Sequence, residues 1–135
     1  MDIIKKVKNL DLPLGEYVIV GGGILEALGL RETNDIDVAV TPKLLEKLRE
    51  SGKYKEEIKW GKLFLTGDKI DIITQLNWDK YSTKTEEAIK TATIIDGIPF
   101  LNIEETIKYK TALGREKDFK DMELLKDYQK KHGKN

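Results

Sequence analysis

A short apolar run that ends in a glycine cluster constrains this chain most. Tyr17 to Val20 is a run of four mostly β-branched residues, and three glycines follow it at once. Such a run is typical of a buried strand, and the glycines predict a tight turn. Helix-forming residues follow from Ile24 to Leu28. The segment therefore predicts a strand, a glycine turn and a helix, in that order.

The same alternation of short strands and helices runs along the rest of the chain. Strands are predicted at Ile36–Val40, at Lys62–Thr66 and Ile70–Ile73 joined by a hairpin at Gly67-Asp68, and across Ile94–Phe100 with a hairpin at Asp96-Gly97. Helices are predicted at Ile3–Leu10, Lys43–Glu50 after the N-cap Thr41 and Pro42, Thr83–Thr91, Ile103–Leu113 before a break at Gly114, and Phe119–Lys131 with Asp118 as N-cap.

These elements predict an α/β architecture, an α+β mixed sheet flanked by helices. We expect a single domain over residues 1–135, with a core at about 14–101 and a C-terminal helical segment at about 102–132.

Composition narrows the class of protein further. Lys plus Arg and Asp plus Glu both number 24, so no net charge recruits nucleic acid or an acidic membrane. The chain has no cysteine, which excludes disulfides and thiolate chemistry, and it has no apolar run of signal-peptide or membrane-spanning type. We expect a cytoplasmic protein without a membrane partner. Charged residues make up 36%, and Lys/Glu-rich stretches such as 43–59 are interpreted mainly as solvated helix faces.

The glycine turn is a candidate phosphate site. Gly21 and Gly22 let backbone N–H groups approach a ligand, and a helix N-terminus follows them. Many strand-to-helix turns use glycine for packing alone, so this alternative stays open.

Asp35 and Asp37 form the second candidate feature. Residues i and i+2 of a strand face the same side, with Cα atoms roughly 6.5 Å apart. Two carboxylates about 5 Å apart repel by roughly 3 kcal/mol at an effective dielectric near 20. The pair therefore belongs in open solvent, beside a basic group or around a cation.

Asp71 interrupts the otherwise apolar strand Ile70–Ile73, where an unpaired buried carboxylate would be costly. If this strand pairs beside Ile36–Val40, Asp71 completes a cluster of three carboxylates. Such hard oxygen ligands suit Mg²⁺ or Mn²⁺, and two ions can align the attacking and leaving oxygens around a phosphorus. The alternative is that Asp71 pairs with a Lys or Arg.

These residues resemble the polymerase-β-type nucleotidyltransferase superfamily. Its signature of a hydrophobic residue, two glycines, a spacer and Asp-hydrophobic-Asp is filled by Val20-Gly21-Gly22 and Asp35-Ile36-Asp37, with Asp71 as the later carboxylate. The run 98–121 is similar to the minimal, AbiEii-like group, in which Lys, Arg and Asp recur as Lys110, Arg115 and Asp118 do here. The resemblance extends from about Tyr17 to Leu125. Gly23 departs from it, since many relatives place Ser or Thr there.

The resemblance implies a nucleotidyltransferase-like fold and an enzyme that transfers an NMP from an NTP to a hydroxyl, with release of pyrophosphate. It implies two bound Mg²⁺ or Mn²⁺ ions, with Asp35, Asp37 and Asp71 as metal ligands and catalytic residues. Its nucleotide-binding candidates are Gly21, Gly22, Arg31, Thr33 and Lys110. Lys110 would neutralise phosphate, the alternative being a solvated lysine, and Asp118 is interpreted as a helix cap or a partner of Arg115.

The partners stay open at this point. The nucleotide is ATP or another NTP, and the acceptor is a protein, a tRNA or a small molecule. The resemblance to the minimal group also implies a partner protein or a homo-oligomer, and it includes a toxin–antitoxin system among the expected settings. Two rival functions are a non-catalytic antitoxin that keeps the fold and a nucleotide-binding sensor. Trp60 and Trp78 are interpreted as core or rim aromatics rather than base-stacking platforms.

Overall fold

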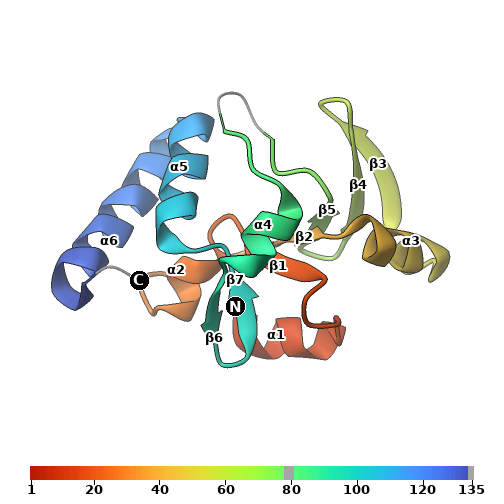
Figure 1. Ribbon diagram of the computed structural model, residues 1–135, viewed down its shortest axis with the longest axis horizontal. Coiled ribbons are helices and arrows are strands. Elements are labelled where there is room, and N and C mark those ends of the chain that lie inside the picture. The colour runs from red at the N-terminus through yellow and green to blue at the C-terminus, as the bar shows by residue number, and fades with distance from the viewer. Residues whose placement is uncertain (78–80, 134–135) are drawn as a thin grey trace.

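The computed structural model describes residues 1–77 and 81–133. Within these residues the fold is a seven-stranded mixed sheet with helices on both faces (Figure 1). The strands are β1 (Tyr17–Val20), β2 (Ile36–Val40), β3 (Lys55–Lys59), β4 (Lys62–Gly67), β5 (Ile70–Ile73), β6 (Thr93–Ile95) and β7 (Ile98–Phe100). The helices are α1 (Ile3–Leu10), α2 (Gly23–Ala27), α3 (Pro42–Glu50), α4 (Thr85–Lys90), α5 (Ile103–Leu113) and α6 (Glu116–His132). The predicted mixed α/β architecture is confirmed.

The strand order is β3-β4-β5-β2-β1-β7-β6. β2 pairs with β5 and β1 with β7 in parallel, whereas the other neighbours are antiparallel. Strands from distant parts of the sequence therefore meet at the centre of the sheet. The consequence for function is the placement of β5 directly beside β2.

The period-2 alternation of the strands divides the core into two layers. Ile36, Val38 and Val40 of β2 pack on the face that α1, α2 and α3 cover, whereas Ala39 lies on the opposite face with residues of α4 and α5. Asp37 shares the face of Ala39, because side chains two positions apart point the same way. The predicted pair of faces, with the carboxylate opposite Ile36 and Val38, is confirmed.

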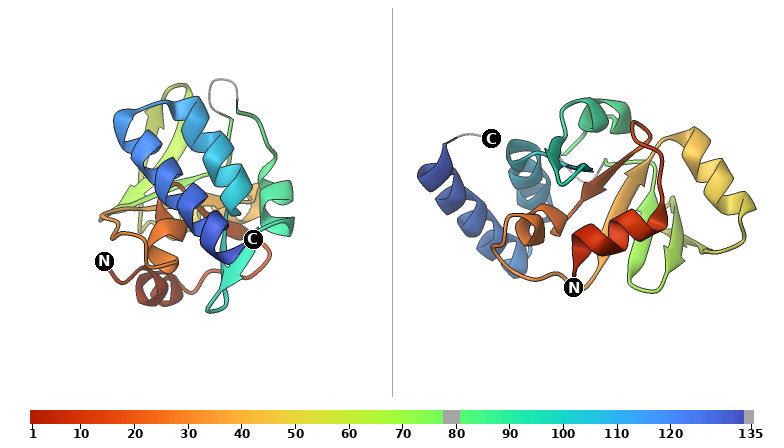
Figure 2. Two further views of the ribbon diagram at one scale, coloured as in Figure 1. Left: turned by 90° about the vertical axis from the view of Figure 1, so that its left-hand side faces the viewer. Right: turned by 90° about the horizontal axis from the view of Figure 1, so that it is seen from below.

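The last two helices form an antiparallel pair (Figure 2). Gly114, in the left-handed conformation, ends α5 as predicted. The predicted start of the last helix is wrong: α6 begins at Glu116 with Arg115 at the N-cap. Asp118 is therefore not the N-cap. It lies at the third helical position and accepts a hydrogen bond from the Arg115 backbone N–H (3.1 Å).

Two local predictions need correction. The second half of the charged stretch 43–59 is not a helix face, since 55–59 is the edge strand β3, paired antiparallel with β4. The hairpin between β4 and β5 turns at Asp68-Lys69 rather than Gly67-Asp68, because Gly67 still pairs with Ile70. Lys69 adopts a positive φ of 58° in this turn. The interpretation of Trp78 lies outside the described residues.

Candidate functional site

The three predicted carboxylates line one cleft of about 870 Å³. Asp37 and Asp71 are register partners on the parallel strands β2 and β5, and Asp35 directly precedes β2. The cleft is bounded by the glycine turn after β1, by β4 and the β3–β4 turn, and by α5 and α6. Figure 1 shows the α5–α6 pair and the β3–β4 hairpin on opposite sides of the central strands.

The cleft is electrostatically unfavourable for Asp37. Burial, followed by the negative charges of Asp71 and Asp35, raises the pKa of its carboxyl to about 6. The positive charges of Lys110 and Arg115 act in the opposite direction. Burial and two neighbouring carboxylates therefore disfavour the ionised form of Asp37.

Asp71 also faces a cation of the protein. Its Oδ2 lies 3.8 Å from Lys59 Nζ, with both side chains about one-third exposed (37% and 34%). The alternative prediction that Asp71 pairs with a Lys or Arg is therefore observed as an ion pair with Lys59, although the pair is a long one. Within residues 1–77 and 81–133, no three Asp, Glu, His or Cys side chains are grouped as a metal-ligand set.

The glycine turn lies against these carboxylates. Gly21 has a φ of +70°, and a Cβ on it would lie 2.7 Å from Asp37 Oδ2. A Cβ on Gly22 would lie 2.5 Å from an Arg31 Nη2. Gly23 is different: it is buried, and a Cβ there would meet Ile19 at 2.6 Å. Gly21 and Gly22 therefore face the cleft, whereas Gly23 is a packing residue, which accounts for its lack of a side chain.

Thr33 lines the cleft but its polar groups are already bound. Its hydroxyl and its backbone N–H both donate to Glu26 Oε1, each at 2.9 Å, and the residue is 4% exposed. The Ile3 backbone N–H donates to the other oxygen of Glu26. Burial acts to raise the pKa of Glu26, but the hydrogen bonds from Thr33 and Ile3 lower it overall. Glu26 thus fixes the loop before β2 to helix α2.

Lys110 is neither solvated nor unpaired. It is 3% exposed, and its Nζ lies 2.9 Å from Asp121 Oδ2 and 3.5 Å from Asp118 Oδ1. The alternative of a solvated lysine is therefore wrong. The predicted partnership of Asp118 with Arg115 is confirmed by a 2.7 Å contact between Arg115 Nε and Asp118 Oδ2.

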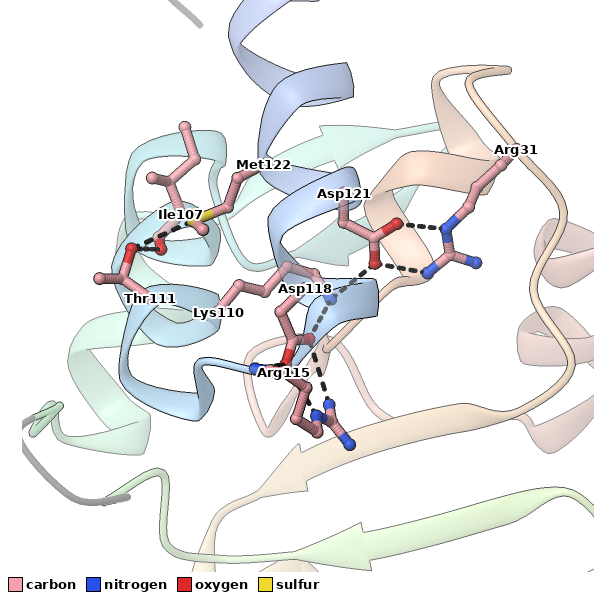
Figure 3. Close-up of polar contacts among 8 residues, drawn as sticks. All are labelled: Arg31, Ile107, Lys110, Thr111, Arg115, Asp118, Asp121 and Met122. Atoms are coloured by element: carbon pink, nitrogen blue, oxygen red, sulfur yellow. Dashed lines mark hydrogen bonds and ion pairs between the residues drawn. The ribbon is translucent and has the colours of Figure 1, made fainter.

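An alternating chain of charges results from these contacts (Figure 3). Arg31 binds Asp121 with Nε and Nη2 at 2.6 and 2.8 Å, Asp121 binds Lys110, and Lys110 leads through Asp118 to Arg115. We call these five residues the ionic chain. Three cations and two carboxylates leave it a net charge of +1. Its outer members Arg31 and Arg115 have side chains 35% and 51% exposed and line the cleft.

Sequence reasoning missed Asp121, Glu26 and the cleft position of Tyr109. A signal for Asp121 did exist: Asp118, Asp121, Met122 and Leu125 are the buried residues of α6 and share one helical stripe. Tyr109 was expected to be a packing residue, and it does pack edge-to-face on Tyr81 at 5.3 Å. It also lines the cleft, and burial, followed by the charge of Asp37, raises its pKa to about 12.

Comparison of the sequence with protein-family models finds no matching family, and comparison with curated proteins finds no significant match. Of the helices within the described residues, none has the length and apolar character needed to cross a membrane.

Proposed function

We propose that the chain is a metal-dependent nucleotidyltransferase of the polymerase-β type. It would transfer an NMP from an NTP to a hydroxyl acceptor and release pyrophosphate. The observation that carries this proposal is the register of Asp37 against Asp71, with Asp35 just ahead, in a cleft that also contains the glycine turn. The motif residues that resemble the superfamily therefore line one cavity.

The chemical type of the acidic side chains in the cleft suits a divalent cation. Three carboxylates supply the hard oxygen ligands that Mg²⁺ and Mn²⁺ prefer, and Asp37 has a raised pKa because of burial and its two acidic neighbours. A bound cation would neutralise the triphosphate and relieve this repulsion. Asp35, Asp37 and Asp71 would hold the cation. Lys59 would compete with the cation for Asp71, because its ammonium already lies beside that carboxylate.

The opposite wall supplies positive charge. Arg31 and Arg115 line the cleft from the two ends of the ionic chain, and Lys117 and Lys120 of α6 line it as well. The three carboxylates on one side of the cleft and the basic residues on the other together suit a ligand that carries both a cation and several phosphate oxygens. Lys110 would act mainly by holding Asp118 and Asp121, because its ammonium already contacts both.

The experiment is a transfer assay. The protein is incubated with each α-labelled NTP, Mg²⁺ and acceptors of three classes: proteins, tRNA and small hydroxyl compounds. We expect label on one class of acceptor, with Mg²⁺ or Mn²⁺ required. The Asp35→Asn/Asp37→Asn double variant should transfer no label above background.

The matched control is Asp68→Asn, since Asp68 is an exposed carboxylate in the turn between β4 and β5. This variant should transfer at the wild-type rate. Equal labelling by the double variant would contradict the proposed roles of Asp35 and Asp37.

A further inference from the structure

Trp60 has a backbone conformation that folding alone explains poorly. It and Gly61 form the two-residue turn between β3 and β4, with φ values of 51° and 74°. A turn with positive φ at both central positions favours Asn-Gly or Asp-Gly. The residue is 70% exposed, so the hydrophobic free energy of burying the indole offsets little of the backbone strain.

Most of the other positions with a positive φ among the described non-glycine residues are occupied by aspartate. The other described non-glycine residues with positive φ are Asp11, Lys69 and Asp96. Asp tolerates the left-handed region, whereas a bulky aromatic residue there is an outlier. Outliers of this kind concentrate at ligand-binding sites, where the position of the side chain matters more than its strain.

The indole lies in the wall of the cleft that holds the three aspartates. Both Trp60 and Phe64 line this cleft, with their ring centroids 5.9 Å apart and their planes at 64°. Thr66 is the register partner of Asp71, and Phe64 lies two positions away on the same face of β4. The face that carries the carboxylates therefore continues into an aromatic surface at the β3–β4 hairpin.

The surroundings hold this surface in place. Phe64 is half-buried, and Lys59 Nζ lies 5.1 Å from its ring centroid. Lys59 Nζ also lies 3.8 Å from Asp71 Oδ2, so one side chain contacts both the aromatic surface and a carboxylate of the cleft. A ligand would fit this arrangement if its phosphates lay at the three aspartates and a flat ring lay against the aromatic residues of the β3–β4 hairpin.

We propose that Trp60, supported by Phe64, is a stacking platform for the nucleobase of the bound NTP. This assignment rests on the nucleotidyltransferase function proposed above and adds the determinant of base binding. Stacking on an aromatic ring tolerates every base, because each base has a π-face. All four NTPs should therefore bind, with purines favoured modestly by their larger ring area.

The experiment separates base binding from phosphate binding. Calorimetric titrations with Mg²⁺ present measure the affinity of ATP, GTP, CTP and UTP, and of inorganic tripolyphosphate, which has no base. The test variant is Trp60→Asn, which places the favoured Asn-Gly pair in the turn and should keep or raise the melting temperature. Trp60→Phe keeps an aromatic ring and serves as the rescue variant.

We expect Trp60→Asn to lose about 10-fold or more in affinity for ATP, since removal of a stacking ring typically has an effect of this size. Its affinity for tripolyphosphate should not change, and Trp60→Phe should bind ATP within a few-fold of wild type. Unchanged ATP affinity in Trp60→Asn, or equal losses for ATP and tripolyphosphate, would overturn the platform alone. Failure of the wild-type protein to bind any of the five ligands would overturn both the platform and the proposed function.

Discussion

Asp37 and Asp71 are direct register partners on the parallel strands β2 and β5, so their carboxylates leave the same face of the sheet side by side. Burial of Asp37, followed by the charges of Asp71 and Asp35, disfavours its ionised form and raises its pKa to about 6, so the ionised carboxylate raises the free energy of the folded protein at neutral pH. A fold gains no stability from this arrangement. Residues that oppose stability in this way are typical of sites that bind a ligand.

Asp37→Asn should therefore stabilise the protein at pH 8. The folded-state pKa is raised from 3.8 to about 6, so the protonated carboxyl suits the fold, and stability falls as the pH rises through that window. The neutral amide avoids this loss, which is on the order of 3 kcal/mol. Urea unfolding should show the variant to be more stable at pH 8 and equal to wild type near pH 4. A less stable variant at pH 8 would refute the electrostatic account.

Gly21→Ala should destabilise the protein and weaken nucleotide binding. The new Cβ would lie 2.7 Å from Asp37 Oδ2 at a φ of +70°, so it adds both backbone strain and a steric conflict with the carboxylate. We expect a loss of about 2 kcal/mol in the free energy of unfolding.

Gly29→Ala is the matched control for this change. Gly29 has a φ of +75° with no atom within 4 Å of its Cβ position, so it carries the backbone strain alone. It should cost about 1 kcal/mol and leave nucleotide binding intact. Equal effects of the two substitutions would mean that Gly21 is not required for close approach to Asp37.

Asp121→Asn should be the most destabilising of these substitutions. It leaves the buried Lys110 and the paired Arg31 without their shared carboxylate, and removing one partner of a buried ion pair costs about 3 kcal/mol or more. Asp127→Asn, an exposed change on the same helix, should alter stability by less than about 0.5 kcal/mol. Unfolding curves in urea that coincide for both variants would show that the ionic chain does not anchor α6.

Lys59→Met should raise the affinity for Mn²⁺ by roughly 2- to 5-fold, because an exposed ion pair of this kind is worth up to about 1 kcal/mol. The ammonium that lies 3.8 Å from Asp71 would be gone, while the aliphatic stem remains. Lys55→Met, which removes the pair between an exposed lysine and Glu57, is the control. Weaker Mn²⁺ binding in Lys59→Met would argue that Lys59 belongs to the site rather than competing with it.

The sequence was sufficient for most of the sheet and helices. β1, β2 and β5 are short apolar runs between glycines or turns, and Thr41-Pro42 marks the start of α3 as predicted. β3 was missed because its residues, KEEIK, are mostly charged and it lies at the edge of the sheet. Its pairing comes from backbone hydrogen bonds to β4, which a side-chain pattern does not reveal.

The candidate site was predictable only in part for a similar reason. Asp35 and Asp37 could be placed together from their spacing, whereas the position of Asp71 beside them required the non-local pairing of β2 with β5. The partners of Lys110 come from α6 and those of Thr33 from α2, so both roles depend on tertiary packing. Spacing within one element is readable from a sequence, but contacts between elements are not.

Mn²⁺ binding in the presence of a non-hydrolysable NTP, followed by electron paramagnetic resonance, tests the central claim most directly. The wild-type protein should bind Mn²⁺ saturably, Asp37→Asn and Asp71→Asn should each lose at least about 10-fold in affinity, and Asp68→Asn should match wild type. Identical Mn²⁺ binding by wild type, Asp37→Asn and Asp71→Asn would contradict a metal site at these carboxylates.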